Sequence, residues 1–428
     1  MKSIDELYKE LNSLPNGYIS KKTIKGHNYF YLQYFESGYL KSKYISKSQV
    51  ELYKSQIARR KIIEKQIHQL ERSGQNLITL STNHRKLSGH LMSGDTIVAS
   101  FNEGVLTYID TDKAPFIIKR SQSLQRFLSK RIFDDSRVNT RLLKKVMSIK
   151  EKDPIYISLL VHGAVISDDY WFKARGSRTK YKDIIFSDIY ADVSLKGIIY
   201  PYLKKNKLSP DLTLNGSYEK CWKRINDSWW LFKKENELER FSEIFSSELA
   251  KQLGIPTVKY FLDGDFIKCE NFAKYYNFEP ISSLCDEDDS YNHVFNTLFD
   301  LDKSLAFDYL KLMMFDVIVN NVDRHNENYG FLRDKQTGKV VSLAPNFDNN
   351  LSLLAVDPLL SSKDGFISIF KKFLKENSNA YELFKEIHIG LLDESTIRGI
   401  IKNIPIKIDN EDALVSYILN RYYKVINL

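Results

Sequence analysis

Short hydrophobic runs separated by glycine-containing turns open the chain. Three runs within residues 17–45 are rich in aromatic and β-branched side chains: Tyr18 to Ile24, Tyr29 to Phe35 and Tyr39 to Ile45. This alternation of runs and turns is typical of hairpins, so it predicts a three-stranded β-meander. A stretch with few apolar positions follows, from about Lys47 to Ser73. It predicts a polar helix.

Residues 76–204 have a mixed pattern. Their apolar runs predict one strand and two helices, namely Thr96 to Phe101, Ser121 to Arg131 and Arg137 to Ser148. Ser136 precedes the second helix and could cap it, because a serine hydroxyl accepts a hydrogen bond from a first-turn N–H. Further on, Tyr170 and Trp171 follow an apolar segment, and we expect both to pack in a core.

From residue 205 the pattern changes to strands around one long helix, and then to helices. Ser228 to Lys234 predicts a strand, and Val258 to Leu262 with Phe266 to Glu270 predicts a hairpin. Asn236 to Leu253 predicts a helix, because its apolar residues recur at helical spacing. After residue 290 the chain is expected to be mainly helical. This order is that of a bilobal α+β fold.

Composition narrows the class of protein. The chain has 428 residues, enough for two or three domains, and its 13% aromatic content is typical of a globular protein. The three cysteines form no close pair and no metal-ligand spacing, which argues against disulfides and structural zinc. Charged residues occupy the first positions, where a signal peptide would be apolar, and no run is long enough for a membrane span. We expect a cytoplasmic protein with no membrane partner.

The net charge of +9 is concentrated near the start of the chain. Residues 1–75 hold 14 lysines and arginines against 7 acidic residues, a balance of +7. One interpretation is a nucleic-acid-binding region in which lysines contact phosphates, namely Lys21, Lys22, Lys25, Lys41 and Lys43. The alternative is a small packing or dimerisation module, since basic stripes are common on solvated surfaces.

The most informative motif is Asp323-Arg324-His325-Asn326-Glu327-Asn328 with Asp348 beyond it. Transfer of a phosphoryl group needs a carboxylate that orients the acceptor hydroxyl, and oxygen ligands for Mg²⁺. Protein kinases place this base and an asparagine ligand five residues apart, as Asp323 and Asn328 are. Asp348 follows a short extended run and would be the second metal ligand. A polar surface turn is the alternative, but apolar segments flank the motif on both sides.

These residues resemble the HipA-like kinase family. The likeness rests on the Asp-Arg-His-Asn motif and on Leu343-Ala344-Pro345 with Phe347-Asp348, and it extends upstream through Leu214 to Lys220 and Trp229 to Lys233. The Asp-Arg-His-Asn motif is also similar to that of phosphoinositide 3- and 4-kinases. The resemblance implies an ATP- and Mg²⁺-dependent serine/threonine protein kinase with a HipA-like bilobal fold.

The family pattern implies roles for two charged residues of the small lobe. Lys233, at the end of an aromatic strand, would hold the nucleotide phosphates, although Lys234 is an alternative because adjacent strand residues face opposite sides. Glu243 would form an ion pair with this lysine, with Glu239 and Glu248 as the competing carboxylates.

The remaining nucleotide contacts are less specific in sequence. Gly216, Ser217 and Lys220 form the only available phosphate loop, which lacks the triple-glycine pattern, as do HipA-like kinases. Thr213 falls where some family members carry a self-phosphorylated serine. The hinge that binds adenine is expected around Glu270 and Phe272, and His325 would support the catalytic loop.

Four segments are therefore expected. They are a basic meander and helix (1–75), a mixed α/β region (76–204), a kinase small lobe (205–275) and a helical large lobe with the catalytic loop (276–428). Two other functions remain open. One is a kinase for a lipid or small molecule, and the other is a pseudokinase that binds nucleotide without activity. The acceptor and the oligomeric state are not determined by the sequence.

Overall fold

The computed structural model divides into two compact units, Met1–Arg85 and Lys86–Leu428. The described residues are 10–11, 13–15, 17–24, 27–36, 39–72, 87–133, 137–149, 153–184, 186–201, 203, 208–216, 218–285, 290–321, 323–353 and 365–428. Lys25, Ser136 and Ser217 lie outside them. None of the helices in these ranges has the length and apolar character of a membrane span.

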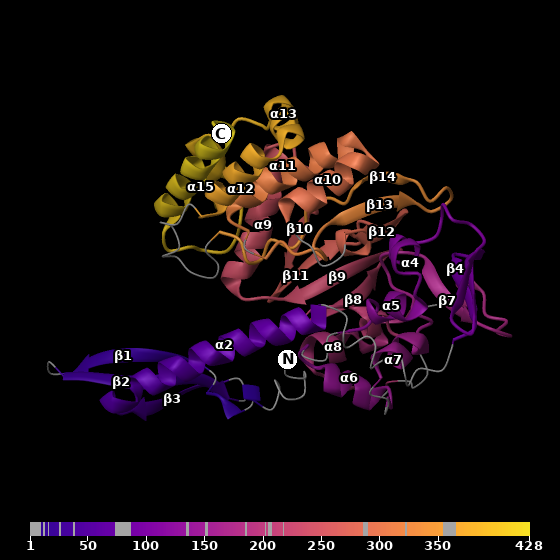
Figure 1. Cartoon of the computed structure of the whole chain (residues 1–428), viewed down its shortest axis with the longest axis horizontal. Coiled ribbons are helices and arrows are strands. Elements are labelled where there is room, and N and C mark those ends of the chain that lie inside the picture. Colours follow the sequence, from indigo (N-terminus) through magenta and orange to yellow (C-terminus); the bar gives the residue numbers. More distant parts are fainter. Residues whose placement is uncertain are drawn as a thin grey trace. The chain divides into compact units, whose positions relative to one another are not determined.

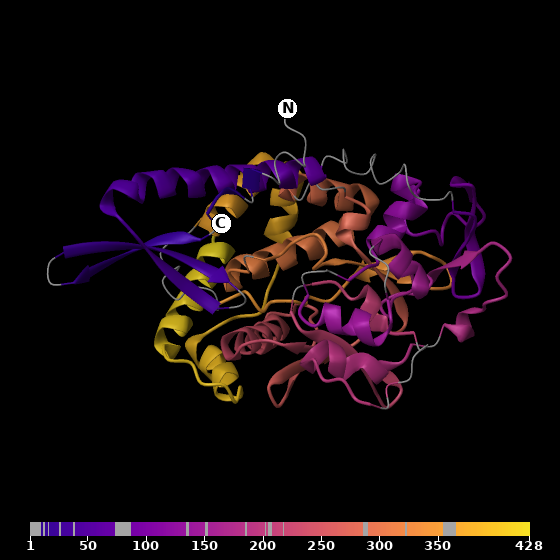
Figure 2. The ribbon, with the colours of Figure 1, turned by 90° about the horizontal axis from the view of Figure 1, so that it is seen from below.

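The first unit is an antiparallel sheet with one long helix. Strands β1 (Tyr18–Ile24), β2 (His27–Glu36) and β3 (Tyr39–Ile45) pair in chain order, as the hydrophobic runs predict. Helix α2 (Val50–Arg72) follows and packs against β1, and Figures 1 and 2 both show it lying along the sheet. Arg60 Nη1 donates to the carbonyls of Leu11 and Leu14, which attaches the preceding segment to the helix.

The second unit begins with a four-stranded antiparallel sheet in the order β6-β5-β4-β7. Its strands are β4 (Gly89–Ser93), β5 (Thr96–Asn102), β6 (Val105–Tyr108) and β7 (Tyr170–Ala174). Short helices accompany it, namely α4 (Phe116–Ser121), α5 (Leu124–Ser129), α6 (Thr140–Val146), α7 (Pro154–Leu160) and α8 (Ala191–Lys196). Tyr170 and Trp171 are buried as expected. The cap expected at Ser136 lies outside the described residues, and α6 begins at Thr140 with Asn139 at its N-cap.

The small lobe is a four-stranded sheet with one helix. Strands β8 (Lys220–Ile225), β9 (Ser228–Lys234), β10 (Tyr260–Asp263) and β11 (Phe266–Glu270) are arranged β10-β11-β9-β8. Helix α9 (Glu237–Gln252) starts at a capping box, in which Asn236 accepts from the Glu239 N–H and Glu239 accepts from the Asn236 N–H. The capping box therefore fixes the start of the helix after only two residues beyond β9.

The large lobe joins a small antiparallel sheet to a helical bundle. Strands β12 (Tyr276–Pro280), β13 (Gly330–Asp334) and β14 (Val340–Leu343) pair in chain order. The helices are α10 (Tyr291–Leu301), α11 (Lys303–Val319), α12 (Gly365–Glu376), α13 (Ser378–Glu386), α14 (Glu394–Lys402) and α15 (Glu411–Ile426). Helix α11 is apolar on all sides and lies within the main core among the other helices (Figure 1). Short 3-10 helices lie at Lys47–Gln49, Tyr181–Asp183, Asp188–Tyr190, Pro210–Thr213 and Ile281–Ser283.

A buried polar network connects the N-terminal sheet of this unit to β12. Glu279 forms an ion pair with Arg333 and accepts hydrogen bonds from the Tyr170 hydroxyl (3.2 Å) and the Phe116 N–H (2.7 Å). A buried charge needs such partners to offset its lost hydration. The network therefore holds the region of residues 87–201 against the large lobe.

Candidate functional site

Lys233 is the centre of a buried cluster of charges. Its side chain points inward from the end of β9, and its Nζ lies 2.5 Å from Glu243 Oε1, 2.6 Å from Asp348 Oδ1 and 3.4 Å from Glu235 Oε1. Burial alone would lower the pKa of Lys233, but the three carboxylates outweigh it and raise that pKa well above its ordinary value. Lys233 is therefore a permanently charged ammonium at the junction of both lobes.

The alternatives weighed from sequence lie elsewhere. Lys234 is exposed and reaches Glu219 at 3.2 Å on the other side of the strand. Glu239 caps α9 and accepts from the Tyr218 hydroxyl. Glu243 is fully buried, and its second oxygen accepts the Asn349 N–H at 2.7 Å. The pairing of Lys233 with Glu243 is thus present in the structure.

Asp348 has the properties of a metal ligand. Its backbone is left-handed (φ 60°), which turns its carboxylate towards Lys233. Burial would raise the pKa of Asp348, but the positive charges of Lys233, Lys220 and Arg324 outweigh it and lower that pKa, so the carboxylate is ionised. Asn328 lines the same cavity, and its Nδ2 donates to the Asp323 carbonyl at 3.2 Å. The amide oxygen of Asn328 and the carboxylate of Asp348 are the hard oxygen ligands that Mg²⁺ prefers.

Three carboxylates near Lys233, those of Glu235, Glu243 and Asp348, also lie close enough together to bind a cation. The Lys233 ammonium already contacts all three. Glu235 is buried, and neither of its oxygens has a hydrogen bond. Burial raises the pKa of Glu235 to about 8, an effect that Lys233 only partly offsets. This carboxyl is therefore mainly protonated at neutral pH, which makes it a weaker metal ligand than the ionised Asp348.

Arg324 holds the catalytic-loop segment to the segment around Asp348. Its guanidinium donates two hydrogen bonds of 2.9 Å to Asp316 and further bonds to the carbonyls of Asn328 (2.9 Å) and Phe347 (2.7 Å). It also donates to the side chains of Asn346 and Asn349. A planar guanidinium suits several simultaneous acceptors. Arg324 therefore fixes where Asn328 and Asp348 lie relative to each other.

Asp323 lies at the start of this loop. Its own N–H donates to Asn321 Oδ1 at 3.1 Å, and its carbonyl accepts from the His325 N–H at 2.8 Å. Burial raises the pKa of Asp323, with a smaller contribution from Asp348 and an opposing one from His325. His325 is exposed and lines the cavity, where its Nδ1 accepts the Glu327 N–H. Asp323 lies beside the cavity lining and not in it.

Two of the phosphate-loop candidates, Gly216 and Lys220, line the same cavity. Gly216 has a φ of +103°, which favours glycine, and a Cβ there would come within 2.1 Å of Lys220 Nζ, so the lysine side chain would have to move. Burial lowers the pKa of Lys220 to about 8, and the nearby charge of Lys233 acts in the same direction. Thr213 also lines the cavity, and its hydroxyl donates to backbone carbonyls of Ala164 and Pro210.

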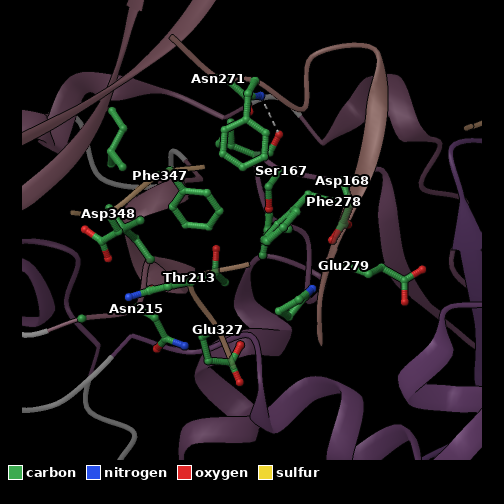
Figure 3. A pocket seen from close by; sticks show the side chains of 18 of the residues that line it. Ser167, Asp168, Thr213, Asn215, Asn271, Phe278, Glu279, Glu327, Phe347 and Asp348 are labelled. Carbon is green, nitrogen blue, oxygen red and sulfur yellow. Dashed lines mark hydrogen bonds between the residues drawn. The ribbon is translucent and has the colours of Figure 1, made fainter. Parts of the chain in front are cut away.

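One cavity of about 540 Å³ is lined by Lys220, Lys233, Asn328 and Asp348 (Figure 3). Its inner wall is apolar and aromatic: Phe272 packs on Phe347 (ring centroids 5.2 Å apart) and on Phe278 (5.3 Å). Glu270, the last residue of β11, and Phe272 both line it. A mostly apolar cavity with a few convergent charges at one end is the usual form of a small-molecule site.

The region before the small lobe also contributes to this cavity, which sequence reasoning missed. Asn271 Nδ2 donates to the Ile166 carbonyl at 3.2 Å (Figure 3). The Phe278 N–H donates to the Ser167 carbonyl at 2.9 Å. Lys130 Nζ contacts Glu327 of the catalytic loop at 2.9 Å. These contacts join residues more than a hundred positions apart, so no local pattern could have indicated them.

Comparison with protein families agrees with this geometry. Residues 205–410 match the model of the HipA-like C-terminal domain. This part of the chain is a HipA-like domain. Residues 2–55 match a domain family of unknown function, DUF6788. No curated protein matches the chain.

Solved structures include two that are similar to this chain. The proinflammatory kinase CtkA of Helicobacter pylori is 20% identical and covers 49% of this chain and 91% of its own, with a TM-score of 0.41. The second is a chain from the toxin–antitoxin complex of HipA, HipB and operator DNA of Shewanella oneidensis MR-1. It is 13% identical and covers 79% of this chain and 97% of its own, with a TM-score of 0.50. The second likeness extends beyond the HipA-like domain. The bilobal α+β fold expected from the sequence is thus confirmed.

Proposed function

We propose that this protein is an ATP- and Mg²⁺-dependent kinase that phosphorylates a serine or threonine of a protein. The observation that carries the proposal is the buried contact of Lys233 with both Glu243 and Asp348, at the charged end of an apolar cavity. In protein kinases the same three roles, a phosphate-binding lysine, its helix carboxylate and a metal-binding aspartate, must be in place together.

Each residue would have a defined task. Lys233 and Lys220 would bind the phosphates, and Gly216 leaves room for them beside Lys220. The adenine would lie against Phe272, Phe278 and Phe347, near the backbone around Glu270. Asn328 and Asp348 would hold Mg²⁺, which when bound neutralises charge on the phosphates. The HipA-like family membership supports both ATP and a divalent metal.

Asp323 would act on the acceptor hydroxyl. Its pKa is raised by partial burial, which makes the carboxylate a better proton acceptor while leaving it reachable from the catalytic loop. Arg324 and His325 would position the loop and would not exchange protons with the substrate. The hydroxyl proton would pass to Asp323 as the acceptor oxygen bonds to the γ-phosphorus of ATP, while the bond from that phosphorus to the β–γ bridging oxygen breaks and ADP leaves.

The test is incubation of the full-length protein with γ-labelled ATP and Mg²⁺. The acceptor is a protein mixture in one sample and phosphoinositide vesicles in a parallel sample. We expect label in protein, and Asp323→Ala should reduce it by about 10²–10⁴, the usual effect of losing a general base. ATP binding should change little, because Asp323 lies outside the cavity lining. Label only in phosphoinositide vesicles would favour a lipid kinase. ATP binding without transfer to any acceptor would favour a pseudokinase.

A cytoplasmic location and the four-segment domain division remain predictions. A nucleic-acid partner for residues 1–75 is likewise a prediction.

A further inference from the structure

The sheet of the first unit carries tyrosines on one of its faces. In the pairing of β1 with β2, Lys22 is opposite Tyr29 and Ser20 is opposite Tyr31. In the pairing of β2 with β3, Tyr31 is opposite Tyr44. Directly paired residues point to the same side of an antiparallel sheet, and every second residue along a strand returns to it. Tyr18, Tyr29, Tyr31 and Tyr44 therefore share one side, which we call the tyrosine face.

The tyrosine face is the solvent-accessible side of the sheet. Leu32 and Ile45, which belong to the other side, are buried at 6% and 1% exposure. Tyr18 and Tyr44 are 56% and 57% exposed. Aromatic side chains with so much accessible area are not part of the core of this unit.

The rings of the tyrosine face lie close to one another. The Tyr44 ring lies 5.8 Å from Tyr31 and 6.5 Å from Tyr29, and Lys22 Nζ lies 5.3 Å from the Tyr31 ring. Gln33 lies between them and donates to Ser20 and Ser42, so the polar residues of the face are hydrogen-bonded to each other. The result is a row of aromatic surfaces with hydroxyls, an amide and an ammonium among them.

Lysines line both edges of this sheet. Lys21 and Lys22 lie on β1 and Lys43 on β3, which are the two edge strands, and all three are exposed. Residues 18–45 contain five lysines and a single acidic residue, Glu36. Among the described side chains of the tyrosine face there is no carboxylate. Lys22 lies on the tyrosine face, whereas Lys21, opposite Phe30, and Lys43, opposite Leu32, point to the other side. An anionic ligand on the tyrosine face would therefore meet the Lys22 ammonium beside the rings and no described carboxylate.

We infer that the tyrosine face binds single-stranded nucleic acid. Unpaired bases would stack on Tyr31 and Tyr44, and Lys22, on the same side of the sheet, would contact a phosphate. Aromatic rings in a basic surface bind single strands because every base offers a flat face, whereas bases in a duplex are already stacked on one another. An apolar protein partner fits less well, because lysine, serine and glutamine are interspersed with the rings. The inference does not depend on the kinase activity proposed above.

The test uses the full-length protein and fluorescence anisotropy. The probes are labelled oligo-dT and oligo-U of about 20 nucleotides, longer than the roughly 4–16 that one single-strand-binding fold covers. We expect binding to at least one of them, with the affinity falling as salt rises, because lysines displace counterions. A duplex of the same length should bind more weakly. Tyr44→Ala should weaken binding by about tenfold or more, as the loss of one stacking ring does.

Matched variants make the result specific. Tyr44→Phe keeps the ring and should bind like the wild type, whereas Ser42→Glu places a negative charge beside the ring and should weaken binding even if Tyr44→Ala proves unstable. Tyr156→Ala removes a tyrosine of similar exposure (51%) from the other unit and should have no effect. No binding at low salt, equal loss in Tyr156→Ala, or a preference for the duplex would overturn the inference. Unchanged kinase activity in Tyr44→Ala would separate it from the proposed function.

Discussion

Lys233 and Glu243 form a buried ion pair with 2.5 Å between Nζ and Oε1, although ten residues separate them. The strand and the helix that carry them are joined by the two-residue connection before α9, and the capping box at Asn236 sets the first turn of that helix. Removing one partner of such a pair leaves an uncompensated buried charge, which typically costs about 3–5 kcal/mol. The pair is thus a structural as well as a candidate functional element.

If the two residues act as one unit, their substitutions will not be additive. Lys233→Met and Glu243→Gln should each lose most of the kinase activity, and the double variant should be little worse than Lys233→Met. Initial rates with γ-labelled ATP give the coupling, which for contacting charged groups is about 0.5–3 kcal/mol. Lys234→Met is the control, since Lys234 is exposed and pairs only with Glu219 among the described residues. Fully additive losses would mean that the pair has no common function.

Arg324 should be more important for stability than an ordinary arginine. Arg324→Lys keeps the charge but cannot reproduce two parallel bonds to Asp316 together with those to Asn346 and Asn349. We expect a loss of about 3 kcal/mol or more in the free energy of unfolding, measured with urea. Arg398→Lys is the matched control, because Arg398 pairs with three acidic residues at the surface. Equal small effects in both variants would contradict the role of Arg324.

Glu235 should make the protein less stable as the pH rises. Burial raises the pKa of Glu235 from 4.5 to about 8, so between these values the folded protein keeps a proton that the unfolded chain has released. Folding is therefore favoured at low pH within this window and loses that contribution as the pH approaches 8. Glu235→Gln cannot titrate, and its stability relative to the wild type should increase between about pH 5 and 8. Urea unfolding at several pH values measures this difference. A constant difference would mean that Glu235 is ionised throughout.

Asp348→Asn should remove the Mg²⁺ dependence of ATP binding. Asparagine accepts the left-handed backbone at this position (φ 60°) and keeps the shape of the side chain, but it loses the negative charge. Calorimetric titration with ATP, with and without Mg²⁺, should give a metal-dependent affinity for the wild type and equal affinities for the variant. Asp265→Asn, in the exposed turn between β10 and β11, is the control and should behave like the wild type.

Local sequence patterns determined the elements of this fold closely. Strand β9 has the predicted limits, and α9 differs from expectation by one residue at each end, because it combines a strong period with a cap. The strands of the first unit were equally well indicated by their glycine turns. Strand β12 and the pairing of β13 were not indicated, because short strands in a mixed apolar context lack a distinctive period.

The sequence by itself determined which residue types the site would contain, since Asp323, Asn328 and Asp348 are spaced as phosphoryl transfer requires. It left Lys233 and Lys234 nearly equivalent, because adjacent strand residues differ only in the side they face. Tertiary structure decided between them by bringing Glu243 and Asp348 to one side of β9. It also revealed Glu235 and the contribution of Ile166 and Ser167 to the cavity. Contacts of this kind depend on how distant segments pack, and packing is a property of the whole folded chain that no local pattern contains.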